Sequence, residues 1–154
     1  YYFDQSLMHE LKQLVKDEDL EDKFIFTGYA ERVESYISDF DIFFIPSKYE
    51  DPFPRVVIEA MSLGKPVLGY NIGGIGEAID NKINGFSFNL KDKGVVDYLL
   101  ELIEDEELRL KMSYEARKKA VNNYDSRIIA TKIIDNLKLL FSWCPIRNFY
   151  ANSC

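Results

Sequence analysis

Short apolar runs separated by segments of helical periodicity most constrain how this chain can fold. Glycine, proline or polar residues bound each run, as expected of buried strands. The runs are residues 24–27, 42–45, 66–70 and 86–88. Helical segments between successive strands imply right-handed crossovers, which produce a mostly parallel sheet with helices on both faces. We therefore expect a layered α/β domain.

The helical segments carry apolar residues at spacings of three and four. They cover residues 4–16, 33–40, 95–103, 106–121 and 126–141, and a further helix is expected to follow Pro54. Residues 142–154 have no usable period, although Trp143 makes them apolar for a chain end. We expect residues 1–141 to form a single domain and residues 142–154 to form an irregular tail. The tail either docks on a partner or did not evolve with this domain.

Acidic residues outnumber basic ones by 26 to 19, which gives a formal charge of -7. A field of this sign repels a nucleic-acid backbone, so DNA and RNA are not expected partners. The two cysteines, Cys144 and Cys154, lie at the chain end and offer no disulfide framework for a core. The sequence contains neither a bilayer-spanning apolar run nor a recognisable signal peptide. We expect a cytoplasmic protein.

The loop after residue 45 is the candidate binding segment, because ligands of doubly wound sheets bind beyond the carboxyl ends of the strands. Pro54 suits a helix start, where its missing N–H would have no partner. The free amides of that helix start and the Arg55 guanidinium favour an anion such as phosphate. Glu59 lies about 7 Å further along the axis, at roughly 1.5 Å per residue. We expect its carboxylate to be buried and to take its donors from ligand hydroxyls.

Residues 51–67 resemble the EPFG…EAMAxGxPV signature of the retaining glycosyltransferases of the glycogen-synthase-like, group 1 type. The resemblance continues through residues 73–77 and 84–86, and it reaches back to residues 26–28 and 41–47. It extends over roughly residues 24–141 in the order and spacing of the family. It implies the C-terminal half of the two-domain GT-B fold, which is a Rossmann-like domain that holds the nucleotide-sugar donor.

The resemblance assigns a role to each matched position. It places Asp51 against the donor sugar as the catalytic carboxylate and Glu59 on the ribose hydroxyls. The other positions that it assigns to the sugar, the diphosphate or the base are Glu50, Phe53, Pro54, Arg55, Val56, Gly28, Tyr29, Ser47, Gly73 and Gly74. It implies transfer from a nucleoside diphosphate sugar to a carbohydrate or lipid-linked acceptor, without a metal or another cofactor. A lipid-linked acceptor would bring peripheral membrane association.

Several positions depart from the family pattern. Asp51 is one methylene shorter than the usual glutamate, and Glu50 could replace it only if the loop shifted. Pro54 stands for the usual glycine and removes one amide from the anion site. The first strand of the domain, its basic phosphate clamp and the acceptor domain would all precede Tyr1. We therefore expect this chain to be part of a longer enzyme and to be inactive in isolation.

Other interpretations stay open at this point. The chain could be a non-catalytic nucleotide-binding module, or an α/β protein-interaction module with a decayed site. Residues 73–76 could form only a tight turn between a strand and a helix. Asp39 and Asp41 spell a metal-binding DxD pattern, but they precede a strand and so lie at the wrong edge of the sheet. His9 has no second ligand nearby, so no metal site is expected.

Overall fold

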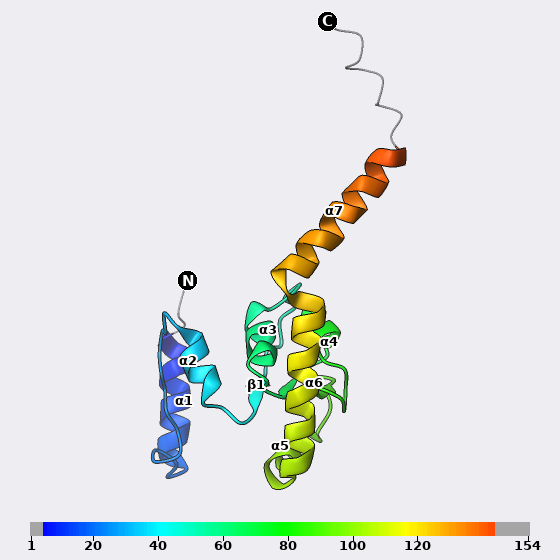
Figure 1. Ribbon diagram of the computed structural model, residues 1–154. Coiled ribbons are helices and arrows are strands. Elements are labelled where there is room, and N and C mark those ends of the chain that lie inside the picture. Colours follow the sequence, from blue (N-terminus) through cyan, green and yellow to red (C-terminus); the bar gives the residue numbers. More distant parts are fainter. Residues whose placement is uncertain (1–4, 144–154) are drawn as a thin grey trace, which may run out of the picture. The chain divides into compact units, whose positions relative to one another are not determined.

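The computed structural model describes residues 5–143 and groups the chain into two compact units (Figure 1). The first unit is Tyr1–Val33 and the second is Glu34–Cys154. Of the described elements, the first unit contains one complete helix, and the second contains the sheet and five complete helices. One further short helix crosses the boundary between the units. The expectation of a single domain over residues 1–141 stays a prediction.

The first unit is built on helix α1 (Gln5–Asp17). The segment that follows α1 folds back along it and brings Phe24 and Phe26 into contact, with their ring centroids 6.4 Å apart. The Lys12 Nζ of α1 lies over the Phe26 ring, 5.7 Å from its centroid. Val15 is the one residue of this unit that the structure buries fully among those it describes. The unit therefore has only a small apolar core of its own.

The predicted strand at residues 24–27 is wrong, because these residues have no regular secondary structure. A strand requires a neighbour that accepts and donates its ladder hydrogen bonds, and the described part of the first unit contains no other strand. The apolar run is also poorly covered, since Ile25 is 89% exposed. The pattern thus identified an apolar segment correctly but not its pairing.

The second unit is organised around a parallel three-stranded sheet, as predicted. The strands are β1 (Phe43–Ile45), β2 (Val67–Tyr70) and β3 (Gly85–Phe88), in the order β1-β2-β3. The register pairs Phe43 with Val67 and Tyr70 with Phe88. Each observed strand lies within one residue of the predicted bounds.

The helices also agree with the predicted segments to within a few residues. They are α2 (Val33–Ser38), α3 (Arg55–Ser62), α4 (Gly73–Ala78), α5 (Val95–Glu104), α6 (Glu106–Tyr124) and α7 (Ser126–Trp143). Residues 73–76, for which a turn was an open interpretation, form the start of α4. Helix α7 includes the first two residues of the predicted tail, and residues 144–154 lie outside the described part of the chain. Within residues 5–143 no helix is both long and apolar enough to cross a membrane.

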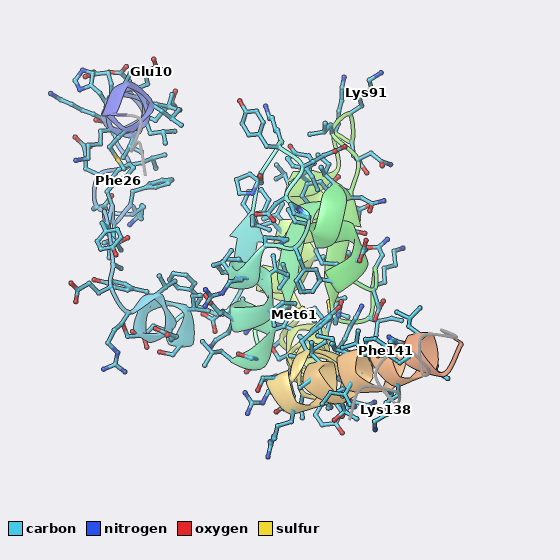
Figure 2. All side chains as sticks on the ribbon, turned by 90° about the horizontal axis from the view of Figure 1, so that it is seen from above. Glu10, Phe26, Met61, Lys91, Lys138 and Phe141 are labelled. Atoms are coloured by element: carbon cyan, nitrogen blue, oxygen red, sulfur yellow. The ribbon has the colours of Figure 1, made fainter. Side chains whose placement is uncertain are left out.

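The core of the second unit lies on both faces of the sheet, as predicted. Val67 on one face packs with apolar residues of α3, α4 and α6. Its neighbour Leu68 on the other face packs with Phe86 and with Leu102 of α5. Met61 of α3 is fully buried, where this helix runs beside α6 (Figure 1 and Figure 2). The alternation of side chains along β2 therefore allows helices to pack on both faces of the sheet.

A polar contact ties α6 to the loop that follows α4. The Lys119 Nζ lies 2.9 Å from the Asp80 carboxylate and donates to the Glu77 carbonyl at 3.1 Å. Only 14% of the Lys119 side chain is exposed, whereas 51% of the Asp80 side chain is. Burial of the ammonium makes its partners necessary, and the exposed carboxylate limits what the pair contributes.

We expect Lys119→Met to lower the free energy of unfolding by about 1–2 kcal/mol, because two hydrogen bonds to a largely buried cation are lost. The measurement is the urea midpoint of the variant and of the unchanged chain. Lys118→Met is the matched control, since Lys118 pairs with Glu115 on the surface of the same helix. Its effect should stay within about 0.5 kcal/mol. Equal effects of the two substitutions would contradict a special role for Lys119.

Candidate functional site

Two loops meet at the carboxyl edge of the sheet, where the sequence placed them. One follows β1 and leads into α3, and the other follows β2 and leads into α4. The Gly74 N–H donates to the Asp51 carbonyl oxygen at 2.8 Å and joins the two loops directly. Both segments therefore lie along one edge of the sheet, as expected of loops that follow the carboxyl ends of parallel strands.

The two loops approach too closely for side chains at the glycines. A Cβ at Gly73 would lie 2.5 Å from the Asp51 carbonyl oxygen, and the φ angle of Gly73 is +50°. A Cβ at Gly74 would overlap the Pro52 carbonyl oxygen and lie 2.6 Å from the Phe53 Cα. Only glycine fits at these two positions without displacing the neighbouring backbone. Gly73 and Gly74 therefore line the loop that carries Asp51.

Asp51 closes a tight turn with its own side chain. Its Oδ1 accepts the Phe53 N–H at 2.9 Å, as in an Asx turn. One carboxylate oxygen thereby has a partner within the turn, and the residue as a whole is exposed. The Phe53 amide, which was expected to meet a ligand, is instead satisfied within the turn.

Helix α3 starts directly after this turn with an uncapped N-terminus. Pro54 is the N-cap residue with φ -70° and ψ 111°, and no side chain caps the helix. No acidic residue lies in the first turn, which begins with Arg55 and Val56. Helix amides without a cap and a positive dipole end favour an anion at this point. The predicted helix start is correct, although Pro54 precedes the helix rather than opening it.

Glu59 is less buried than the sequence suggested. Its side chain is 34% exposed, and its Oε1 lies 3.5 Å from the Arg55 guanidinium one turn earlier. The core side of α3 is formed by Val57, Ala60 and Met61, which leaves position 59 at the boundary of the helix face. The expectation of a buried carboxylate without protein donors was therefore wrong. The carboxylate has a protein donor because Arg55 is its i,i+4 partner on the same face of the helix.

The remaining predicted site residues divide between the two units. Ser47 and Glu50 lie on the loop between β1 and α3, and the Ser47 hydroxyl donates to the Tyr49 carbonyl at 3.4 Å. Gly28 and Tyr29 belong to the first unit, where Gly28 has a φ of +66° and Tyr29 is 84% exposed. Their expected contact with a nucleotide base stays a prediction.

Tyr124 is a neighbour of the site that sequence reasoning missed. Its ring packs edge-on against Phe53, with centroids 5.2 Å apart and an interplanar angle of 62°. Burial raises the pKa of the Tyr124 hydroxyl above its usual value, and the nearby Asp80 and Glu77 carboxylates add to the shift. The hydroxyl therefore stays protonated at neutral pH. No sequence signal marked this residue, which ends a helix 71 positions after Phe53.

The groups at this edge are of the kinds that can bind an anion and hydroxyl groups. A helix N-terminus, one guanidinium and two half-buried or exposed carboxylates lie on adjacent segments. Across residues 5–143 no three His, Cys, Asp or Glu side chains gather as metal ligands would. The metal-free site stays a prediction.

Comparisons with known proteins agree with this geometry. The family described as Glycosyl transferases group 1 matches residues 4–119. The chain is 33% identical over 121 residues to the N-acetyl-alpha-D-glucosaminyl L-malate synthase of Bacillus anthracis, which covers 78% of this chain. It is 29% identical over 140 residues to an alpha-1,3-galactosyltransferase of Escherichia coli that uses UDP-Gal and alpha-D-GlcNAc-diphosphoundecaprenol, with 90% of this chain covered.

Solved structures also resemble the chain. Anabaena Alr3699/HepE in complex with UDP-glucose has a TM-score of 0.80 at 26% identity and covers 89% of this chain. The C-terminal domain of the Francisella tularensis group 1 protein LpcC has a TM-score of 0.72 at 27% identity and covers 80% of it. The chain spans about a third of its curated relatives, 32% and 35% of their lengths, and 38% of the HepE chain. The family match over most of the chain and the parallel α/β fold together show that this protein belongs to the group 1 glycosyltransferases.

Proposed function

We propose that this chain is the donor-binding part of a longer glycosyltransferase, which moves a sugar from a nucleoside diphosphate to a carbohydrate or lipid-linked acceptor. The observation that carries the proposal is the meeting of Asp51, Glu59 and the uncapped start of α3 at one edge of the sheet. These groups match the three parts of a nucleotide sugar: the sugar, the ribose and the diphosphate.

The diphosphate would lie at the start of α3. The helix amides and the Arg55 guanidinium can each donate to its oxygens. Arg55 is free to do so, because its side chain is 90% exposed and its pair with Glu59 is a surface pair at 3.5 Å. Such pairs contribute about 0–1 kcal/mol, so a phosphate can take the guanidinium at little cost. Glu59 would then be released to accept the ribose hydroxyls.

The sugar would lie against the Asp51 turn. Oδ1 of Asp51 is held by the Phe53 amide, which restricts the rotamer of the Asp51 side chain. A carboxylate oxygen fixed in this way can accept a sugar hydroxyl without losing rotamer freedom on binding. Charge that develops on the leaving diphosphate would be stabilised by the α3 amides and Arg55 rather than by a protein nucleophile. The proposed reaction is transfer with retention at the anomeric carbon and without a metal, as the resemblance to the retaining group 1 enzymes implies.

The donor nucleotide in this proposal is UDP. The HepE structure is a complex with UDP-glucose, and the Escherichia coli relative is named for UDP-Gal. Two relatives are named for undecaprenol-linked acceptors, one of them from Campylobacter jejuni, which supports a lipid-linked acceptor and a peripheral place at a membrane. The acceptor would be held by a further domain, consistent with the third of each relative that this chain spans.

The proposal is tested on the protein in its full natural length with a panel of UDP-sugars and carbohydrate and undecaprenol-linked acceptors. We expect a UDP-sugar to raise the melting temperature and a glycoside to form equally well with or without EDTA. Stabilisation without glycoside would favour a non-catalytic nucleotide-binding module. The absence of both would favour a protein-interaction module and would overturn the proposal.

A further inference from the structure

We propose that Gly73, Gly74 and Tyr124 are positioning residues that fix the Asp51–Phe53 turn and, through it, the recognition of the donor's sugar rather than its nucleotide. The inference rests on the proposed function, because it assigns the turn to the sugar end of the donor. These three residues lie on two helices, α4 and α6.

The glycines hold the backbone side of the turn. The Gly74 N–H donates to the Asp51 carbonyl at 2.8 Å, and the missing Cβ atoms of both glycines let the start of α4 touch the Asp51, Pro52 and Phe53 backbone. A methyl group at Gly73 would press on the Asp51 carbonyl at 2.5 Å. The turn could relieve that contact only by moving away from α4. The start of α4 therefore sets how far the turn stands from the sheet edge.

Tyr124 holds the side-chain face of the turn. Its ring meets the Phe53 ring edge-on at 5.2 Å and also packs against the buried cluster of α3, β2, α4 and α6. The Phe53 N–H donates to Asp51 Oδ1 at 2.9 Å, so a shift of Phe53 moves the partner of the catalytic carboxylate. Edge-on aromatic pairs have a preferred geometry, which an aliphatic residue does not reproduce. The position of the Asp51 carboxylate therefore depends on the position of α6, through the contacts of Tyr124 with Phe53 and of Phe53 with Asp51.

The nucleotide end of the site is anchored differently. Glu59 and Arg55 stand on α3, whose place is set by the buried Val57, Ala60 and Met61. The Arg55–Glu59 pair does not involve Gly73 or Gly74, whereas Tyr124 also packs against the buried cluster to which Val57, Ala60 and Met61 belong. A displaced turn should therefore misplace Asp51 while leaving Glu59 where it is. This separation predicts a loss of sugar recognition with unchanged affinity for the nucleotide.

The test compares UDP with UDP-glucose, UDP-galactose and UDP-N-acetylglucosamine as ligands of the full-length protein, by calorimetry and by transfer kinetics. For Gly73→Ala we expect affinity for the preferred UDP-sugar and kcat to fall about tenfold or more, with UDP affinity within about twofold, because small misplacements of a reacting group are costly. Tyr124→Leu should show the same split to a smaller degree. The Tyr124→Leu variant provides a second test of the inference if Gly73→Ala does not fold.

Matched controls separate this role from general destabilisation. Gly64→Ala imposes a similar left-handed strain, with φ +70°, but its Cβ would lie 3.6 Å from its nearest neighbour. Tyr114→Leu removes an exposed ring from the same helix as Tyr124. Both controls should keep the wild-type preference for the UDP-sugar. Equal losses for UDP and UDP-sugar in the test variants, or no loss for either, would overturn the inference alone. A wild-type protein that binds neither ligand would overturn the proposed function and the inference with it.

Discussion

Replacement of Asp51 by asparagine is expected to reduce sugar transfer by about a hundred- to a thousandfold, the range typical for loss of one group that stabilises the transition state electrostatically. The substitution isolates the charge. An asparagine Oδ1 can still accept the Phe53 N–H, so the turn that Asp51 closes at 2.9 Å should persist. UDP affinity should stay within about threefold, because the nucleotide is assigned to α3. Transfer kinetics and UDP calorimetry on the full-length protein measure the two effects.

Asp92 provides the matched control for this substitution. Its Oδ1 accepts the Gly94 N–H at 3.0 Å in a turn of the same kind before α5. Asp92→Asn should leave both transfer and UDP affinity unchanged. If Asp51→Asn were as active as the unchanged protein, the carboxylate at this position would have no part in the reaction and Glu50 would become the candidate.

Replacement of Glu59 by glutamine is expected to weaken UDP binding by about ten- to a hundredfold. A hydrogen bond to a charged group is worth about 1.5–3 kcal/mol, and each 1.4 kcal/mol is a factor of ten in the dissociation constant. The structure favours the lower half of this range, because the carboxylate is 34% exposed rather than buried. Glutamine also loses the Arg55 pair, which frees the guanidinium for the diphosphate and partly offsets the loss.

The control for Glu59 is Glu115→Gln. Glu115 has a similar exposure of 29% and a comparable surface pair, with Lys118 at 3.0 Å. Its replacement should change UDP affinity by less than about twofold, since surface pairs contribute little. Loss of affinity in both variants to the same extent would show a general electrostatic effect instead of ribose recognition. Unchanged affinity in Glu59→Gln with intact folding would remove Glu59 from the site.

The parallel sheet could be predicted from the sequence because three apolar runs are each bounded by a proline, a glycine or a polar residue. The run that ends before Pro46 and the run that starts at Pro66 match β1 and β2 to within one residue. Residues 24–27 carry the same signal but form no strand, because apolar character does not specify a pairing partner. Pairing is a non-local property, so periodicity alone cannot supply it.

The candidate site was partly predictable for a similar reason. Parallel strands place their following loops at one edge, so topology predicts that Asp51 and Gly74 share that edge, although their hydrogen bond is seen only in the structure. The exposure of Glu59 was misjudged, because depth along a helix axis says nothing about the side of the helix on which a residue lies. Tyr124 was missed because its contact with Phe53 depends on how α6 packs in three dimensions.

The most direct test of the central claim is to locate UDP on the 154-residue chain by NMR, with ¹⁵N-labelled protein titrated with UDP. We predict that the largest shift changes fall on residues 51–59, with binding weaker than micromolar, because a helix N-terminus contributes only about 0.3–1 kcal/mol to an anion. The same sample supplied with UDP-sugars and acceptors should form no glycoside. Shift changes confined to other segments, or none at millimolar UDP in a folded chain, would contradict the assignment of the donor to this edge of the sheet.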